Sequence, residues 1–131
     1  MATGLSSSIA NSLLDALCNG TNYTALTQPI YLKLHTGDPG SAGTANAAGN
    51  TTRKSVSFGA AASGVCSNDA AISWTSGEVT TSEDYTHWSL WSASTAGTFY
   101  MSGTLTANAV TAGDTFTIAI GDLDLSLVVA A

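Results

Sequence analysis

Asp122 and Asp124 are two carboxylates that strand geometry would place on one face, as the catalytic pair of a glycoside hydrolase requires. Residues two apart on a strand have Cα atoms about 7 Å apart, a separation close to that between paired glycosidase carboxylates. These acids alternate with Leu123 and Leu125, however. Alternating acids and leucines are typical of any strand with one face in solvent. The pattern therefore favours solvated side chains over a catalytic pair.

The two histidines of the chain, His35 and His87, are candidate metal ligands. A zinc site would need them to converge with cysteine or carboxylate ligands, and no local ligand spacing supports this. His35 stands three residues before Asp38 at the end of a strand-like run, which predicts a hydrogen bond that organises a turn. His87 stands among aromatic residues and is expected to pack. The sequence thus predicts neither a metal site nor a cofactor.

Nucleophilic catalysis lacks its usual signals. The serines form no Gly-x-Ser-x-Gly turn, and neither Cys18 nor Cys66 has a neighbouring histidine or basic group to activate it. The glycines are scattered at turns, so no phosphate-binding loop is formed. We expect both cysteines to be buried free thiols rather than a disulfide. Together these patterns predict a protein that is not an enzyme.

The aromatic residues are more informative. They form a cluster that consists of Tyr85, Trp88 and Trp91 together with Trp74 and Tyr100. On a strand, Trp88 and Trp91 point to opposite faces, so they cannot both enter the same core. Three interpretations remain open: the strand is covered on both sides, one ring lies in a subunit interface, or one ring stacks on a sugar. The predicted interface or binding residues are Trp88, Trp91, Tyr100 and Tyr85.

The low charge of the chain excludes several partners. Only 9% of its residues are charged and its formal net charge is -6. Lys33, Arg53 and Lys54 are its only basic residues, too few to neutralise phosphates, so nucleic acid and anionic membrane surfaces are disfavoured. The longest apolar run, residues 123–131, is interrupted and far shorter than the roughly 20 residues of a membrane span.

The elements that must position these residues begin with a helix. At 131 residues the chain fits one domain, 1–131. Residues 5–18 carry an apolar stripe at spacings of three and four, and the Asn19-Gly20 pair is typical of a helix end. The predicted domain therefore has an N-terminal helix within 1–20 and a β-sandwich over 28–131. The stripe consists of Leu5, Ile9, Leu13, Ala16 and Leu17.

The rest of the chain shows short runs with a period of two, bounded by turn residues, and no helical period between them. This pattern predicts a mainly β fold, an antiparallel sandwich or jelly-roll-like barrel. Residues 36–52 form a long loop expected to carry an interface or wrap a neighbour. In the last run, one face would be apolar and consist of Leu123, Leu125, Leu127 and Val129. The first of the seven predicted strands starts at Ile30. The other six span 54–58, 71–75, 87–91, 98–105, 114–120 and 123–129.

The order of several segments resembles small virion proteins of tailed bacteriophages, of the tail-fibre or minor tail type. They are GLSSSIANSLLDALCNGT, YLKLHTGDPG, TTRKSVSFGAAASG, AISWT, YTHWSLWSASTAGTFYMSGTL and VTAGDTFTIAIGDL, and they cover nearly all of the chain. The resemblance implies a structural protein of the virion that packs with copies of itself and other virion proteins. It carries over no catalytic residue. Trp88 departs from it, since a smaller apolar residue is expected there, and Cys66 is also unusual.

Three alternatives stay open beside this interpretation. The protein could be a capsid decoration protein that cements the phage head rather than part of the tail. It could be a carbohydrate-binding module that contacts host surface glycans through Trp91 or Tyr100, or a hydrolase that uses Asp122 and Asp124. The N-terminus has no basic region ahead of its apolar part, so we expect no secretion signal and synthesis in the host cytoplasm before incorporation into the virion.

Overall fold

The computed structural model describes residues 3–130, and it is mainly β with one helix near its N-terminus. Residues 1, 2 and 131 of the predicted domain 1–131 lie outside the described residues. The elements are α1 (Ser7–Asn19), β1 (Ile30–His35), β2 (Lys54–Val56), β3 (Val65–Ser67), β4 (Ile72–Trp74), β5 (Glu83–Trp91), β6 (Phe99–Val110), β7 (Phe116–Ile118) and β8 (Asp124–Ser126).

The main layer is a four-stranded antiparallel sheet in the order β2-β1-β5-β6. Its two central strands alternate apolar and polar residues in register, so that Leu32 lies opposite Leu90 and Leu34 opposite Trp88. Both leucines of β1 are completely buried. Because side chains alternate along a strand, all four of these residues face the same core. Tyr31, Lys33 and His35 of β1 and their neighbours Ser89 and Trp91 of β5 face the other side of the sheet.

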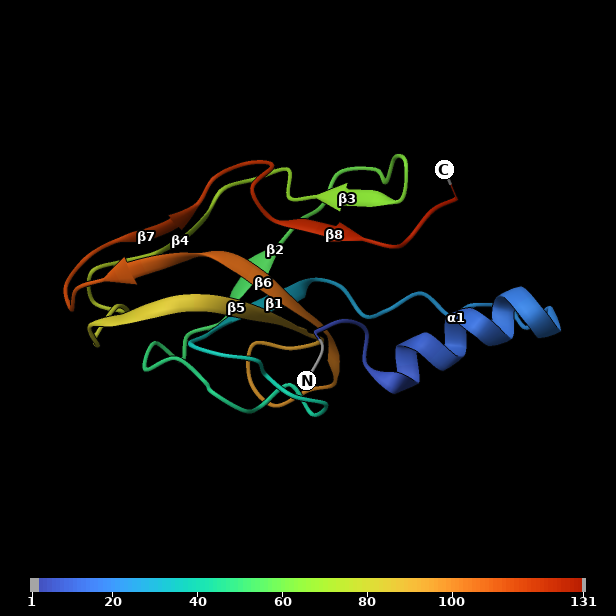
Figure 1. The fold of residues 1–131 in the computed structure, drawn as a ribbon, viewed down its shortest axis with the longest axis horizontal. Helices are drawn as coiled ribbons and strands as arrows, with labels where there is room; N and C mark the ends of the chain where they lie inside the picture. Colours follow the sequence, from blue (N-terminus) through green and yellow to red (C-terminus); the bar gives the residue numbers. More distant parts are fainter. Residues whose placement is uncertain (1–2, 131) are drawn as a thin grey trace.

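Two short ribbons form the second layer over that core face, β4 with β7 and β3 with β8 (Figure 1). Their aromatic residues reach into the core, where the Phe116 ring centroid lies 5.6 Å from that of Trp74 and 5.0 Å from that of Tyr85. The Trp74 indole is fully buried, and its Nε1–H donates to the Thr52 carbonyl at 2.8 Å. Two facing antiparallel layers with a short N-terminal helix confirm the predicted fold class.

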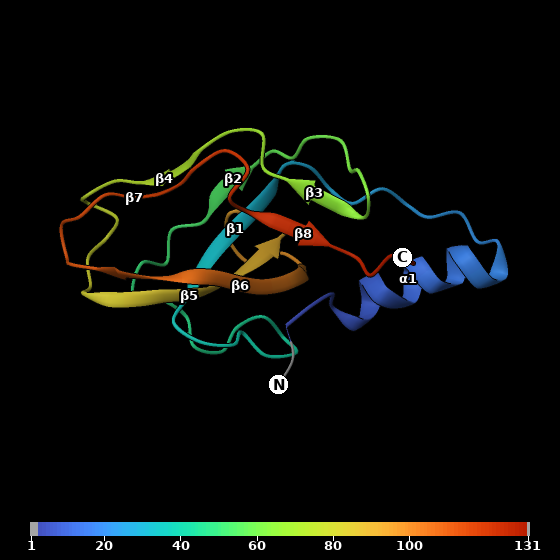
Figure 2. The same ribbon diagram turned by 45° about the horizontal axis from the view of Figure 1, so that its top comes forward.

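Helix α1 ends as the sequence predicts, but it packs on the sandwich only over its first half. The Ser6 side chain accepts from the Ile9 N–H, and Gly20 adopts the left-handed conformation with φ 66°. Ile9 is 8% exposed, whereas Leu17, near the far end, is 81% exposed. Figures 1 and 2 both show the helix projecting beyond one end of the sandwich. The predicted apolar stripe is therefore partly exposed to solvent.

The chain before the helix is joined to the last long strand of the main sheet. Ser6 N–H donates to the Tyr100 carbonyl at 2.7 Å, and Ser102 N–H donates to the Gly4 carbonyl at 2.8 Å. Leu5 forms an isolated antiparallel bridge with Met101. These bonds fix the starting point of α1 against the outer edge of β6.

Most strand bounds differ from the predicted ones. Strands β2, β4 and β7 are shorter than predicted, and three larger differences follow. Strand β3 was not predicted, because its three residues are too few to show a period. Strands β5 and β6 are longer than predicted. The predicted strand over residues 123–129 is only Asp124–Ser126, and Leu127 and Val129 are 57% and 56% exposed. The apolar face predicted there is covered at Leu123, which is 1% exposed, but not at Leu127 and Val129, which lie beyond the end of β8.

Candidate functional site

The face of the main sheet away from the core carries a buried hydrogen-bond chain. His35 Nε2 lies 2.7 Å from Ser89 Oγ, and the Trp91 indole N–H donates to the same oxygen at 2.7 Å. His35 Nδ1 lies 2.8 Å from the Ala45 carbonyl oxygen. Since a carbonyl only accepts, His35 donates from Nδ1, and its Nε2 accepts the Ser89 hydroxyl proton. Every polar atom of the three side chains then has a partner.

A serine hydroxyl bonded to a histidine nitrogen is also the arrangement of an activated nucleophile. Here both His35 and Ser89 are completely buried, and neither borders the surface hollows described below. The histidine reaches across to the loop of residues 36–52, which runs beneath the sheet in Figure 1. The pair thus fastens this loop to β1 and β5. The predicted turn-organising bond exists, but its acceptor is Ala45 rather than Asp38.

The other end of the same loop is fastened by Glu83. Its carboxylate accepts from the Gly49 N–H at 2.8 Å and from the Asn50 N–H at 3.4 Å. A carboxylate that binds two backbone N–H groups holds them more strongly than a neutral acceptor would. Glu83 is the first residue of strand β5. The loop wraps its own sheet, and the expected interface on it stays a prediction.

Acidification is expected to destabilise this arrangement. Burial lowers the pKa of His35 below its ordinary value of 6.5, opposed by the Ala45 hydrogen bond and assisted by the charge of Lys33 and by His87. Below about pH 6.5 the imidazole of His35 therefore binds a proton in the unfolded chain but not in the folded chain. The free energy of unfolding must fall as the pH falls from that value through the folded pKa, by up to about 1.4 kcal/mol per pH unit.

Urea unfolding at a series of pH values checks this expectation. His35→Gln removes the titrating group, so the variant should be less stable at neutral pH and should show a flatter pH dependence between neutral pH and the acid limit. An unchanged pH dependence in His35→Gln would show that other groups control the acid sensitivity. His87→Gln is the matched control, because it also replaces a histidine but keeps His35 and its bonds to Ala45 and Ser89, so most of the pH dependence should remain.

Trp91 is enclosed by side chains of the same chain. The Arg53 guanidinium lies over its ring at 4.2 Å from the centroid, and the Phe99 ring centroid lies 5.5 Å away. Arg53 also donates from Nη1 to the carbonyls of Ala93 and Ala96, at 2.9 Å and 2.7 Å. The Arg53 guanidinium thus covers the indole and also closes the turn between β5 and β6. Trp91 is 6% exposed.

The other predicted binding residues are buried as well. Trp88 is 3% exposed and lies over Gly103, with its Nε1–H donating to the Thr104 carbonyl at 3.2 Å. Tyr85 and Tyr100 are 0% and 6% exposed. The geometry corresponds to the interpretation in which β5 is covered on both sides. An interface around these four residues stays a prediction, and it would have to be formed by the residues that cover them.

The remaining candidates are placed apart from one another. His35 and His87 are cross-strand neighbours on β1 and β5, but both nitrogens of His35 are engaged. Within residues 3–130, no group of three or more His, Cys, Asp or Glu side chains could hold a metal. Asp122 lies in the turn before β8, and Asp124 accepts from the Ser67 hydroxyl, so the two acids do not share a strand face.

Both cysteines are free, as predicted, although the prediction that they are buried is wrong. Cys18 is exposed on α1, and Cys66 is partly buried, with its Sγ 3.1 Å from the Gly59 carbonyl. No helix in the described part of the chain is long and apolar enough to cross a membrane.

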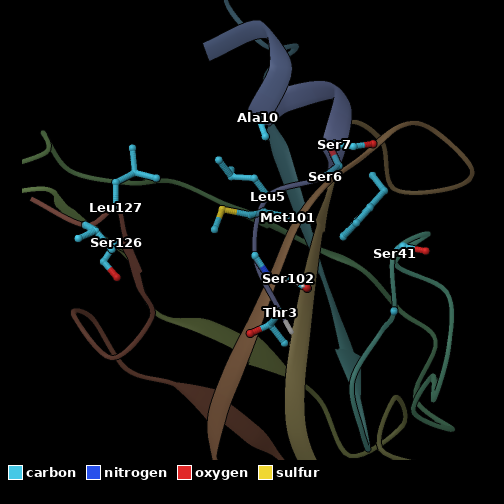
Figure 3. Close-up of a pocket in the computed structure, with 14 residues that line it drawn as sticks. Thr3, Leu5, Ser6, Ser7, Ala10, Ser41, Met101, Ser102, Ser126 and Leu127 are labelled. Atoms are coloured by element: carbon cyan, nitrogen blue, oxygen red, sulfur yellow. Dashed lines mark hydrogen bonds between the residues drawn. The ribbon is translucent and has the colours of Figure 1, made fainter. Parts of the chain in front are cut away.

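The exposed apolar surface gathers where α1 meets the end of the chain. A hollow of about 620 Å³ lies between the segment before α1, the start of the helix and the C-terminal segment. Figure 3 shows Leu5 and Met101 directed towards the side where Leu127 lies. A second hollow, of about 260 Å³, has an almost wholly apolar lining that includes Leu5, Leu13, Leu125 and Leu127. No charged residue lines either hollow.

A known family accounts for almost the whole chain. A family model described as podophage GP4 fiber I protein gp80 matches residues 4–126. The chain belongs to this podophage fibre family. The match includes α1 and every strand through β8, so the projecting helix is part of the fibre-family region rather than an addition to it. No curated protein matches the chain.

Membership of the podophage fibre family confirms the resemblance to phage tail-fibre-type proteins and identifies a virion component. It directs attention to surfaces rather than to a reaction centre. The polar residues capable of chemistry are used inside the fold, whereas the apolar end is the described surface that the fold itself does not cover. Sequence reasoning did not find this end, although its apolar stripe and terminal leucines were visible, because the pattern does not show which apolar side chains the fold leaves uncovered.

Proposed function

We propose that this protein is a non-enzymatic structural component of a podophage fibre that works by packing against copies of itself and other virion proteins. The match to the fibre family over residues 4–126 is the observation that carries the proposal. The uncharged apolar surface at the α1 end supports it, because contiguous exposed apolar patches are typical of protein interaction sites. In a particle with many copies, several weak contacts of this kind reinforce one another.

The fate of the candidate catalytic residues supports the non-enzymatic part of the proposal. Ser89 and His35 lie where a substrate has no access, and Asp122 and Asp124 do not converge. A glycan-binding role gains no support from the tryptophans, since Arg53 already occupies the face of Trp91 that a sugar would stack on.

Cryo-EM of the particle that contains this chain tests the proposal. We expect density for the β-sandwich in the fibres, with neighbouring copies or other virion proteins in contact with it. Density on the capsid lattice instead would replace the fibre role with head decoration. Absence of the chain from purified particles would contradict both. The carbohydrate alternative fails separately if Trp91→Ala leaves glycan binding by the particle unchanged.

A further inference from the structure

The outer face of the main sheet, away from the core, carries two cations that no carboxylate of the described chain neutralises. Leu32 of β1 lies opposite Lys54 of β2. The next pair along these antiparallel strands is Lys33 with Arg53, whose side chains therefore lie side by side on the other face. The described part of the chain contains one ion pair, Lys54 with Glu78 at 2.7 Å. Burial and the charge of Arg53 lower the pKa of Lys33, and no carboxylate opposes this shift.

The fold holds Arg53 in place but leaves donors of both cations free. Arg53 lies over the Trp91 ring and donates from Nη1 to two carbonyls of the turn between β5 and β6. Among the described residues, its other side-chain nitrogens and the Lys33 ammonium have no hydrogen-bond acceptor. Like charges directly opposite each other destabilise a strand pair. The two cations therefore cost the isolated chain stability, and an anion between them would remove that cost.

We propose that Lys33 and Arg53, the cationic pair, bind carboxylates of a second copy of the same chain. The acidic patch of that copy, which consists of Asp69, Asp122 and Asp124, presents these carboxylates. The inference rests on the proposed packing of the protein against copies of itself. It names a polar contact that is separate from the apolar end at α1.

The acidic patch lies in the second layer of the sandwich. Asn68 and Leu123 bond to each other twice, at 3.2 Å and 2.9 Å. The three acids directly follow Asn68 or flank Leu123, so these bonds hold them in one region, and all three are exposed. Figures 1 and 2 show β3 and β8 on the opposite side of the main sheet from the loop of residues 36–52. That loop lies on the face of the cationic pair, since it bonds to His35.

Charge and geometry together select a second copy as the partner. The chain has nine acidic residues against three basic ones, so an extended polyanion is repelled by most of its surface, whereas a small patch of carboxylates can reach the cationic pair alone. The pair and the patch lie on opposite layers, so two copies would meet front to back. A contact between two different surfaces of one chain repeats from copy to copy and builds rings or filaments.

Sedimentation velocity of the full chain at low and high salt tests this contact. Raising the salt from about 0.02 M to about 0.5 M should increase its dissociation constant about tenfold, because screening weakens ionic contacts. Apolar contacts at the α1 end would not be weakened in this way. Lys33→Gln should raise the dissociation constant at low salt about two- to fivefold, the effect of losing a partly exposed ion pair. The thermal midpoint of the monomer should stay the same or rise, because the repulsion from Arg53 is removed.

Lys54→Gln is the matched control. It removes the same charge from a neighbouring position, but Glu78 already neutralises Lys54, so its self-association should equal that of the wild type. If Lys33→Gln and Lys54→Gln associate alike, or if the association of the wild type does not respond to salt, the inference is overturned.

A mixing experiment identifies the occupant of the cationic pair. Lys33→Glu removes the basic half of the contact and Asp124→Lys reverses a charge in the acidic half, so neither variant alone should associate at low salt. An equimolar mixture should form pairs, because the acidic patch of the first variant is intact and so is the cationic pair of the second. A mixture that stays dissociated overturns the inference. Retention of the wild type but not of Lys33→Gln on polygalacturonate, together with a dissociated mixture, would assign the cations to an acidic glycan instead.

Failure of the proposed function is a different result. A chain that passes these tests but is absent from fibres contradicts the fibre role, whereas a fibre chain whose association is indifferent to Lys33→Gln contradicts only this contact.

Discussion

Replacing Gly103 by valine is expected to prevent stable folding, although Gly103 needs no special backbone conformation. It lies on β6 directly opposite Trp88 of β5, and a Cβ at this position would stand 2.2 Å from Trp88 Cζ2. The indole is 3% exposed, so it can yield only by shifting towards the hollow of about 280 Å³ that it borders together with Gly103. Even Gly103→Ala should cost about 1 to 3 kcal/mol in overpacking, and the branched valine should cost more.

A double-mutant cycle measures this relation directly. Trp88→Val alone leaves a large cavity and should cost about 3 to 5 kcal/mol, the range for loss of a buried large aromatic side chain. In the double variant, the methyl group of Gly103→Ala enters the space that the indole left, so its cost should largely disappear. Chemical denaturation of the four proteins gives the coupling energy.

The control for the cycle is Gly77→Ala, where a Cβ meets nothing within 4 Å. It should change stability by no more than about 0.5 kcal/mol. Equal costs for Gly103→Ala in the presence and absence of Trp88 would refute the steric explanation. The cycle also bears on the departure of Trp88 from the smaller residue expected in the family, since Gly103 supplies the room that the larger ring requires.

Ser89→Ala is expected to produce the second large loss of stability, about 2 to 5 kcal/mol. The substitution removes one oxygen but leaves two buried groups without a partner, His35 Nε2 and the Trp91 indole N–H. Each buried group left unpaired costs about 1 to 3 kcal/mol. The loop fastened by His35 should loosen as well, so amide hydrogen exchange at Ala45 and Asn46 should become faster.

Ser73→Ala is the matched control for this experiment. Its hydroxyl pairs with the Thr117 hydroxyl at 2.9 Å on an exposed strand surface, where water can replace the lost bond. We expect a change of less than about 0.5 kcal/mol there. If Ser89→Ala were as mild as Ser73→Ala, the buried chain of hydrogen bonds would not be the element that holds the loop.

The local elements of this fold are predictable from sequence where pattern and packing agree. Strand β1 shows the expected alternation because its leucines face a core on one side only. Helix α1 ends at Gly20 because glycine adopts the left-handed conformation there without steric cost. The terminal run from Leu123 to Val129 has an equally clear period, yet only Asp124–Ser126 is a strand. The alternation of apolar and polar residues shows which side chains are apolar, but it does not show whether the rest of the chain covers them.

The buried site could not be predicted, because it depends on which strands are neighbours. His35 and Ser89 are 54 residues apart in the chain, and only the β1–β5 pairing brings them together. Their shared face follows from the alternation within each strand, but the register between the strands does not. Similarly, Glu83 gave no signal of its role, since its partners are backbone N–H groups that carry no residue-type signature.

The bonds between the segment before α1 and strand β6 impose an order on biosynthesis. Gly4 and Ser102 are 98 residues apart, so the emerging chain has no docking edge for its own N-terminus until most of it has been translated. Contacts that close so long a loop form late and raise the contact order of the fold. Helix α1 therefore docks only after most of the sandwich has formed. A chain that ends before β6 therefore cannot hold α1 in its final position, because it lacks the Tyr100 and Ser102 backbone groups that bond the segment before the helix.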